Sequence, residues 1–114
     1  MIENTSTRQQ KVARQIQKDM GEIILREGAP FTLGTMVSVT QVRVSPDFEL
    51  AKIYLSVFPF EKGKDVLATF DANNWLLRKT LGARLRNQLK KIPEITFHLD
   101  DSLEYAANID RILK

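Results

Sequence analysis

The sequence contains no cysteine and a single histidine, His98, among its 114 residues. The absence of cysteine excludes disulfide bonds, thiolate metal ligands and a cysteine nucleophile, and it is typical of proteins from reducing compartments. With 5 glycines and 4 prolines, the chain has too little of either residue for a collagen-like or disordered protein. It also lacks the run of about 20 apolar residues that a membrane span requires, and residues 1–10 lack the apolar core of a signal peptide. We therefore expect a cytoplasmic protein without a membrane anchor.

The length and the hydrophobic content of 43% predict one globular domain that covers residues 1–114. A domain of this size buries roughly two thirds of the surface that its unfolded chain exposes, which is enough for a stable core. The sequence contains no internal repeat and no low-complexity linker.

Periodic apolar residues predict the order of helices and strands. Val12, Ile16 and Met20 share one face of a first helix that begins at Ser6 or Thr7 and ends at Gly28, before a loop at 28–35. Two β-branched runs, at 36–44 and 50–58, flank the turn 45–47 and predict an antiparallel pair of strands. The rest of the chain predicts a helix that begins near Val66, a second helix at 75–91, a strand at 94–100 and a last short helix that begins with 101–104. The complete order is α-β-β-α-α-β-α.

The net charge of +3 is concentrated in one short segment. Residues 78–91 hold 6 basic and no acidic residues, whereas residues 1–77 are balanced at 9 of each, and residues 92–114 hold 2 basic and 5 acidic residues. On the expected helix, Lys79, Arg86 and Lys90 lie opposite the leucine stripe. Because no acidic residue is interleaved with them, we expect this line to bind a polyanion, with phosphate the commonest partner.

A second, weaker basic line follows the first helix at Lys11, Arg14 and Lys18. If both helices pack on the same face of the sheet, the two lines form one track. Three aromatic residues, Trp75, Tyr54 and Phe58, are possible stacking partners for bases, but their positions favour core packing.

The sequence gives little indication of a catalytic site. His98 has no marked orienting partner, so an ordinary half-exposed strand residue is the favoured interpretation. Asp100, Asp101 and Glu104 lack the spacing of a calcium loop and are better explained by helix capping. Nucleotide-binding loops and nucleophile elbows are absent. We expect a protein that is not an enzyme, with no catalytic residue, metal, cofactor or small-molecule substrate.

Four segments in order along the chain carry a resemblance to a known family: 7–13, 39–47 with 51–56, 92–97 and 100–102. Together they resemble ribosome-binding factor A, a bacterial small-subunit maturation protein. The resemblance implies a type II KH-like domain of the α+β class, with an α-β-β-α-α-β core followed by the extra C-terminal helix. It also implies binding to the immature small ribosomal subunit near its neck and decoding region, and a role in rRNA processing.

The chain departs from KH domains at one point. It has no Gly-x-x-Gly loop for clamping nucleotides. The family that it resembles replaces that loop with an Ala-x-Gly kink between two helices, and the matching stretch at 71–75 contains no glycine. Because asparagine tolerates the left-handed conformation, we expect Asn73 or Asn74 to bend or re-cap the chain. Because the sequence runs to Lys114 without the extended polar tail that some relatives carry, we also expect any function of such a tail to be absent.

The function expected from these observations is that of a non-catalytic, monomeric, RNA-binding ribosome assembly factor. Its partners are the small ribosomal subunit and its rRNA, without membrane or small molecule. One alternative is a protein-interaction module that binds an acidic partner or its own copy, and another is a small hydrolase that uses His98 with Asp100 or Asp101.

Overall fold

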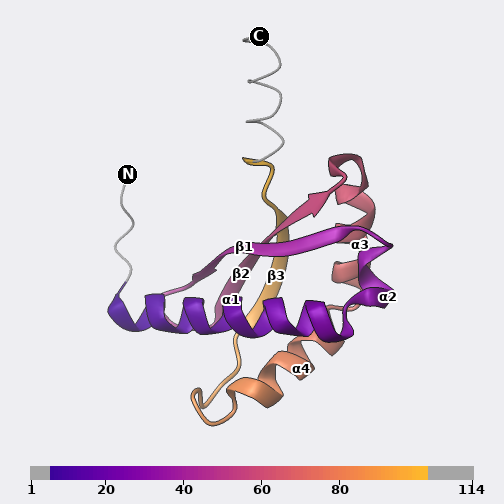
Figure 1. Cartoon of the computed structure of the whole chain (residues 1–114). Coiled ribbons are helices and arrows are strands. Elements are labelled where there is room, and N and C mark those ends of the chain that lie inside the picture. The colour runs from indigo at the N-terminus through magenta and orange to yellow at the C-terminus, as the bar shows by residue number, and fades with distance from the viewer. Residues whose placement is uncertain (1–5, 103–114) are drawn as a thin grey trace.

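The structure is a computed structural model that describes residues 6–102 (Figure 1). In chain order, its elements are α1 (Thr7–Glu27), α2 (Ala29–Thr32), β1 (Met36–Val44), β2 (Leu50–Phe58), the 3₁₀ helix η1 (Phe60–Lys62), α3 (Gly63–Ala72), α4 (Asn74–Leu85) and β3 (Glu94–Leu99). This arrangement confirms the predicted α-β-β-α-α-β order and adds the two short elements α2 and η1. The expected C-terminal helix lies outside the described residues beyond Ser102.

The three strands form one sheet in the order β1-β2-β3. β1 and β2 are antiparallel, as predicted, and β3 runs parallel to β2. The register between β1 and β2 shifts at Thr40, where Gln17 of α1 donates through Nε2 to the carbonyl oxygens of Val39 (3.2 Å) and Thr40 (3.4 Å). The Gln17 amide thus provides a donor for carbonyl oxygens at the point where the pairing of β1 and β2 is irregular.

A capping box fixes the start of α1. The Ser6 hydroxyl accepts from the Gln9 backbone N–H (3.0 Å), and the Gln9 side chain accepts from the Ser6 N–H (2.9 Å). Gln9 also donates through Nε2 to Val44 O (2.9 Å), which ties the beginning of α1 to the end of β1. The N-cap expected at Ser6 or Thr7 is therefore Ser6, and the helix ends before Gly28 as predicted.

Helices cover one face of the sheet. The alternating residues of β2, from Ala51 to Val57, are buried against them as predicted. Phe58, at the end of β2, is exposed, so the prediction that it packs in the core is wrong. The core is completed by side chains that have almost no exposed surface: Ile16, Met20 and Ile23 of α1, Val66 and Phe70 of α3, and Leu77, Leu81 and Leu85 of α4. Figure 1 shows α1 crossing in front of the sheet, with α4 beside the C-terminal half of α1.

The break between α3 and α4 falls at Asn73, as predicted, but through a different backbone conformation. Asn73 has φ −112° and ψ 20°, so the prediction of a left-handed asparagine is wrong. Hydrogen bonds stabilise the break instead: Asn73 donates through Nδ2 to Thr69 O (2.8 Å), and Asn74 donates through Nδ2 to Ile95 O (2.8 Å). The Asn73 amide thus satisfies a carbonyl oxygen of α3 and the Asn74 amide one of β3, and the break needs no glycine because Asn73 keeps a negative φ.

Candidate nucleic-acid interface

The basic segment does not form the single long helix that its sequence predicts. α4 ends at Leu85, and residues 86–91 form turns and bends before β3. The Leu85 carbonyl accepts from the N–H groups of Gln88 (2.8 Å) and Leu89 (3.0 Å), and the Leu89 side chain is buried. The predicted helix over 75–91 is therefore wrong at its C-terminal end, because Leu89 packs into the core while the chain reverses toward β3.

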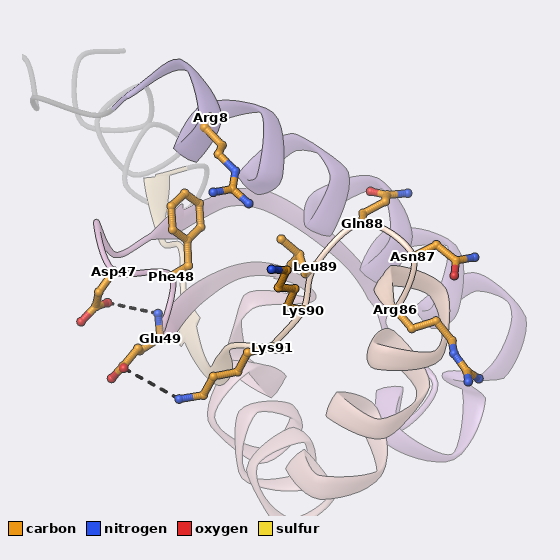
Figure 2. Close-up of a pocket in the computed structure, with 10 residues that line it drawn as sticks. All are labelled: Arg8, Asp47, Phe48, Glu49, Arg86, Asn87, Gln88, Leu89, Lys90 and Lys91. Atoms are coloured by element: carbon orange, nitrogen blue, oxygen red, sulfur yellow. Dashed lines mark hydrogen bonds and ion pairs between the residues drawn. The ribbon is translucent and has the colours of Figure 1, made fainter.

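The turn at 86–91 forms one wall of a cavity with a volume of about 560 Å³. The other walls are the first turn of α1, with Arg8, and the loop between β1 and β2 (Figure 2). Residues from these three segments line it: Arg8, Asp47, Phe48, Glu49, Arg86, Asn87, Gln88, Leu89, Lys90 and Lys91.

Phe48 forms the apolar side of this cavity. Its backbone has a positive φ of 60°, held by its N–H bond to Ser45 O (2.9 Å). The guanidinium carbon of Arg8 lies 4.9 Å from the centre of the Phe48 ring, in a cation–π arrangement that Figure 2 shows. An aromatic ring with a cation above it is a surface on which planar groups can stack.

Both acidic residues of the cavity interact with other groups of the protein. Asp47 accepts through Oδ1 from the Ser45 hydroxyl (2.7 Å) and the Glu49 N–H (3.1 Å). The Ser45 hydrogen bond, followed by that of Glu49, holds the pKa of Asp47 below its ordinary value, so the carboxyl stays ionised. Glu49 lies 3.8 Å, through Oε2, from the Lys91 Nζ.

A smaller cavity of about 180 Å³ continues from the first, because both are lined by Arg8, Gln88 and Leu89. It adds Lys11 from the next turn of α1. We call the two cavities together the basic groove, and its cations are Arg8, Lys11, Arg86, Lys90 and Lys91. Since these cations outnumber the carboxylates of Asp47 and Glu49, the groove is positive.

Tertiary contacts supply counter-charges that the sequence does not show. Arg84 reaches Glu22 Oε1 at 2.6 Å and Asp19 Oδ1 at 3.3 Å, both on α1. Arg78 donates to Ile92 O (2.7 Å) and Pro93 O (2.9 Å). The cations that the sequence analysis selects form no ion pair with any residue of 6–102: Lys11, Arg14, Lys18, Lys79, Arg86 and Lys90.

The structure gathers three of these selected residues at the basic groove. Lys11, Arg86 and Lys90 line it, although α1 and the 86–91 turn are far apart in sequence. The others lie elsewhere, and the expected single track is only partly formed: Arg14 and Lys18 are exposed farther along α1 and line neither cavity, and Lys79 lies at a separate cavity with Trp75.

Sequence reasoning missed three residues of the groove: Arg8, Phe48 and Lys91. The turn signal at 45–47 was the available indication that a loop stands out from the sheet here. Its approach to the first turn of α1 depends on tertiary packing, which local sequence patterns do not carry.

The hydrolase alternative finds no support in the geometry of the described residues. The His98 Nε2 lies 2.8 Å from Thr96 Oγ1, and its ring lies 5.2 Å from that of Tyr54. Asp100 instead accepts from the Thr40 hydroxyl (2.6 Å) and the Ser102 N–H (3.0 Å). Those contacts with Ser102 and Thr40 hold the pKa of Asp100 below its ordinary value. His98 is half-buried on the strand, as predicted.

No group of three or more histidine, aspartate or glutamate side chains within residues 6–102 is arranged to hold a metal ion. Every helix of the described part of the chain is too short or too polar to cross a bilayer.

Comparison with known proteins agrees with this architecture. The family model described as ribosome-binding factor A matches residues 8–113. The chain belongs to the ribosome-binding factor A family. A ribosome-binding factor A from Cytophaga hutchinsonii is 44% identical over 108 residues, which cover 95% of this chain and 81% of that protein.

Solved structures of ribosome-binding factor A share the fold, which is KH-like. The crystal structure of the Thermus thermophilus protein superposes with a TM-score of 0.67 at 21% identity, over 80% of this chain and 94% of that one. A homology model of the T. thermophilus ribosome binding factor A, fitted into a cryo-EM map of a 30S–RbfA complex, superposes with a TM-score of 0.63 at 22% identity, over 78% and 91% of the two chains.

Proposed function

We propose that this protein is a ribosome assembly factor that binds the immature small ribosomal subunit through its ribosomal RNA. In the cytoplasm, it assists late maturation and rRNA processing as a monomer, without catalysing a step. Family membership and the 30S complex of the T. thermophilus relative support the choice of partner.

The observation that carries the proposal is the gathering of unpaired cations at the basic groove. Lys11, Arg86 and Lys90 come from distant parts of the sequence, yet they line one continuous hollow and lack acidic partners among the described residues. A stable fold gains little by placing like charges together, whereas a partner that supplies phosphates makes the arrangement favourable.

Phosphate contacts set the position and orientation of a protein on RNA but carry no sequence information. The groove therefore recognises the shape of folded rRNA, with the phosphates arranged to meet cations from α1 on one side and the 86–91 turn on the other. An assembly factor of this kind acts by favouring one conformation of the RNA to which it binds.

Co-sedimentation with immature and mature small subunits tests this function. The variant Arg86→Glu/Lys90→Glu reverses two groove charges, and we expect it to bind immature subunits at least about tenfold more weakly, since each lost phosphate contact removes a favourable release of counterions. The matched control, Lys62→Glu/Lys64→Glu, makes the same change in net charge on exposed residues around the start of α3. We expect its binding to stay within about twofold of wild type.

Equal loss in the two variants would show that only net charge matters and would contradict a role for the groove. Absence of wild-type binding to either subunit, together with a concentration-dependent dimer in ultracentrifugation, would favour the protein-interaction alternative.

A further inference from the structure

The only tryptophan of the chain, Trp75, lies on the surface. Its side chain is 68% exposed in the first turn of α4, so the prediction that it packs in the core is wrong. The helix geometry explains this: Leu77, Leu81 and Leu85 point into the core, and residue 75 is about 160° away from Leu77 around the helix. The exposed ring is free for contact with a planar ligand, which would remove its apolar surface from water.

Trp75 borders a cavity of about 420 Å³ that is separate from the basic groove, with Arg78, Lys79, Gly82 and Ile92 as the other lining residues. Gly82 keeps this hollow open. A Cβ atom at position 82 would lie 3.2 Å from Ile92 Cγ1, which is tighter than ordinary packing. The absence of a side chain lets Ile92 lie against α4 and form an apolar floor beside the indole.

Two cations accompany the tryptophan in different ways. Arg78 is fixed by its hydrogen bonds to the carbonyl oxygens of Ile92 (2.7 Å) and Pro93 (2.9 Å), and its Nη1 lies 3.9 Å from Glu94 Oε2. The Lys79 side chain is exposed and forms no hydrogen bond or ion pair with any residue in the described range. The site therefore combines an aromatic face, a held guanidinium and an unpaired amine, and it lacks a carboxylate among its lining residues.

We propose that Trp75 stacks on an unpaired base of RNA while Lys79 contacts the phosphate of the same nucleotide. Base stacking on an exposed aromatic side chain tolerates any sequence but requires a base whose face is free, so a duplex does not satisfy the site. This proposal deepens the function proposed above and rests on it, since it names an unpaired rRNA segment as the ligand of a second contact.

Basic residues along α4 connect the Trp75 site with the separate basic groove. Arg86, at the C-cap of α4, is seven residues after Lys79, so the two positions share one helix face about 10 Å apart. A single RNA strand that is stacked on Trp75 can thus extend past Lys79 to the groove cations. Charge of one sign along this path favours RNA over a protein partner.

Tryptophan fluorescence gives a direct test because the intact chain has only this one indole. We expect an unpaired oligoadenylate to quench the emission in a saturable way, and a duplex of the same length to quench it much less. The variant Lys79→Gln should weaken the interaction with the oligoadenylate while leaving the unbound emission nearly unchanged. Absence of quenching by the oligoadenylate, or equal quenching by an acidic peptide, would overturn the proposal.

Subunit binding provides a second readout. We expect Trp75→Ala to weaken binding to immature small subunits by about fivefold or more, the size of a lost base-stacking contact. Trp75→Phe keeps an aromatic face and should remain within about twofold. The control Leu25→Ala removes another highly exposed apolar side chain, on α1, and should have no effect. Because Trp75 and Leu25 are both on the surface, urea unfolding should show that all three variants remain folded.

Different results would contradict the proposed function and the stacking proposal. If Arg86→Glu/Lys90→Glu weakens subunit binding but Trp75→Ala does not, the stacking proposal is wrong and the proposed function stands. If wild-type protein does not bind subunits, the proposed function is wrong, and with it the assignment of rRNA as the ligand of Trp75.

Discussion

At the scale of single residues, Arg84 shows how a basic side chain inside a basic segment acquires a structural role. It joins α4 to α1 through Glu22 and through Asp19, whose side chain is almost fully buried. Gln15 also donates to Asp19 Oδ2 (3.0 Å), so the buried carboxylate has two partners. The hydrogen bond from Arg84 holds the pKa of Glu22 below its ordinary value of 4.5. Arg84 therefore stabilises the protein and is not available to a ligand.

We predict that Arg84→Met lowers the free energy of unfolding at neutral pH, because it leaves the buried Asp19 carboxylate without its cation. A group whose pKa is lowered by folding stabilises the folded state above its unfolded pKa, and this contribution is lost as the pH falls through the folded value. The difference between wild type and Arg84→Met should therefore shrink as the pH falls below about 4.5. Urea titrations at several pH values measure it.

The control for this prediction is Lys90→Met, which removes a cation that has no acidic partner among the described residues. Its unfolding midpoint should stay close to that of wild type at every pH. An Arg84→Met protein as stable as this control at neutral pH would show that the contacts with Asp19 and Glu22 contribute nothing.

At the scale of elements, the turn at 86–91 decides the geometry of the basic groove. Residues 86–91 carry Arg86 and Lys90 on either side of Leu89, and Leu89 is the buried residue that holds the turn against the core. Its neighbours across the smaller cavity, Val12 and Leu85, belong to α1 and α4. The turn thus depends on one apolar anchor for its position.

We predict that Leu89→Ala destabilises the protein by about 2–4 kcal/mol, which is typical of removing a buried leucine side chain. Because the turn loses its anchor, binding to immature small subunits should weaken as well, even at temperatures where the protein is folded. The exposed Leu25→Ala is the matched control and should change stability by less than about 0.5 kcal/mol. Unchanged subunit binding by folded Leu89→Ala would show that the groove does not need a fixed turn.

At the scale of the whole molecule, the charge distribution matters more than the net charge. The net charge is only +3, but the six basic residues of 78–91 are not interleaved with acidic ones. The fold neutralises Arg84 with α1 and Lys91 with Glu49, and it leaves Lys79, Arg86 and Lys90 unpaired among the described residues. The positive field is therefore focused on one side of α4 and on the adjoining groove.

We predict a steep dependence of subunit binding on salt. If three or more phosphates contact the groove, the dissociation constant should rise by about tenfold or more between roughly 50 and 200 mM monovalent salt. The Arg86→Glu/Lys90→Glu variant should show a shallower dependence, while Lys62→Glu/Lys64→Glu should keep the wild-type slope. Binding that hardly changes with salt would rule out phosphate contacts as the main source of affinity.

Much of the fold could be predicted from the sequence because its signals are local. The alternation of Ala51, Ile53 and Leu55 is enough to define a strand with one buried face, and both β1 and β2 occur at the predicted bounds. The N-cap and the Gly28 end of α1 are likewise local. The end of α4 could not be predicted, because helix spacing continues through Leu89 in the sequence and only packing against the core stops the helix at Leu85.

The sequence by itself determined that the basic residues of 78–91 have no acidic neighbours within that segment, and it placed Lys79 opposite the leucine stripe of α4, because helical periodicity depends only on residue order. Only the tertiary structure decided where those cations meet. It brings Arg8 and Lys11 of α1 to the 86–91 turn, pairs Arg84 with distant carboxylates and leaves Trp75 on the surface. The physical reason is that ion pairing, cavity formation and exposure depend on distances between segments, and packing of the core sets those distances.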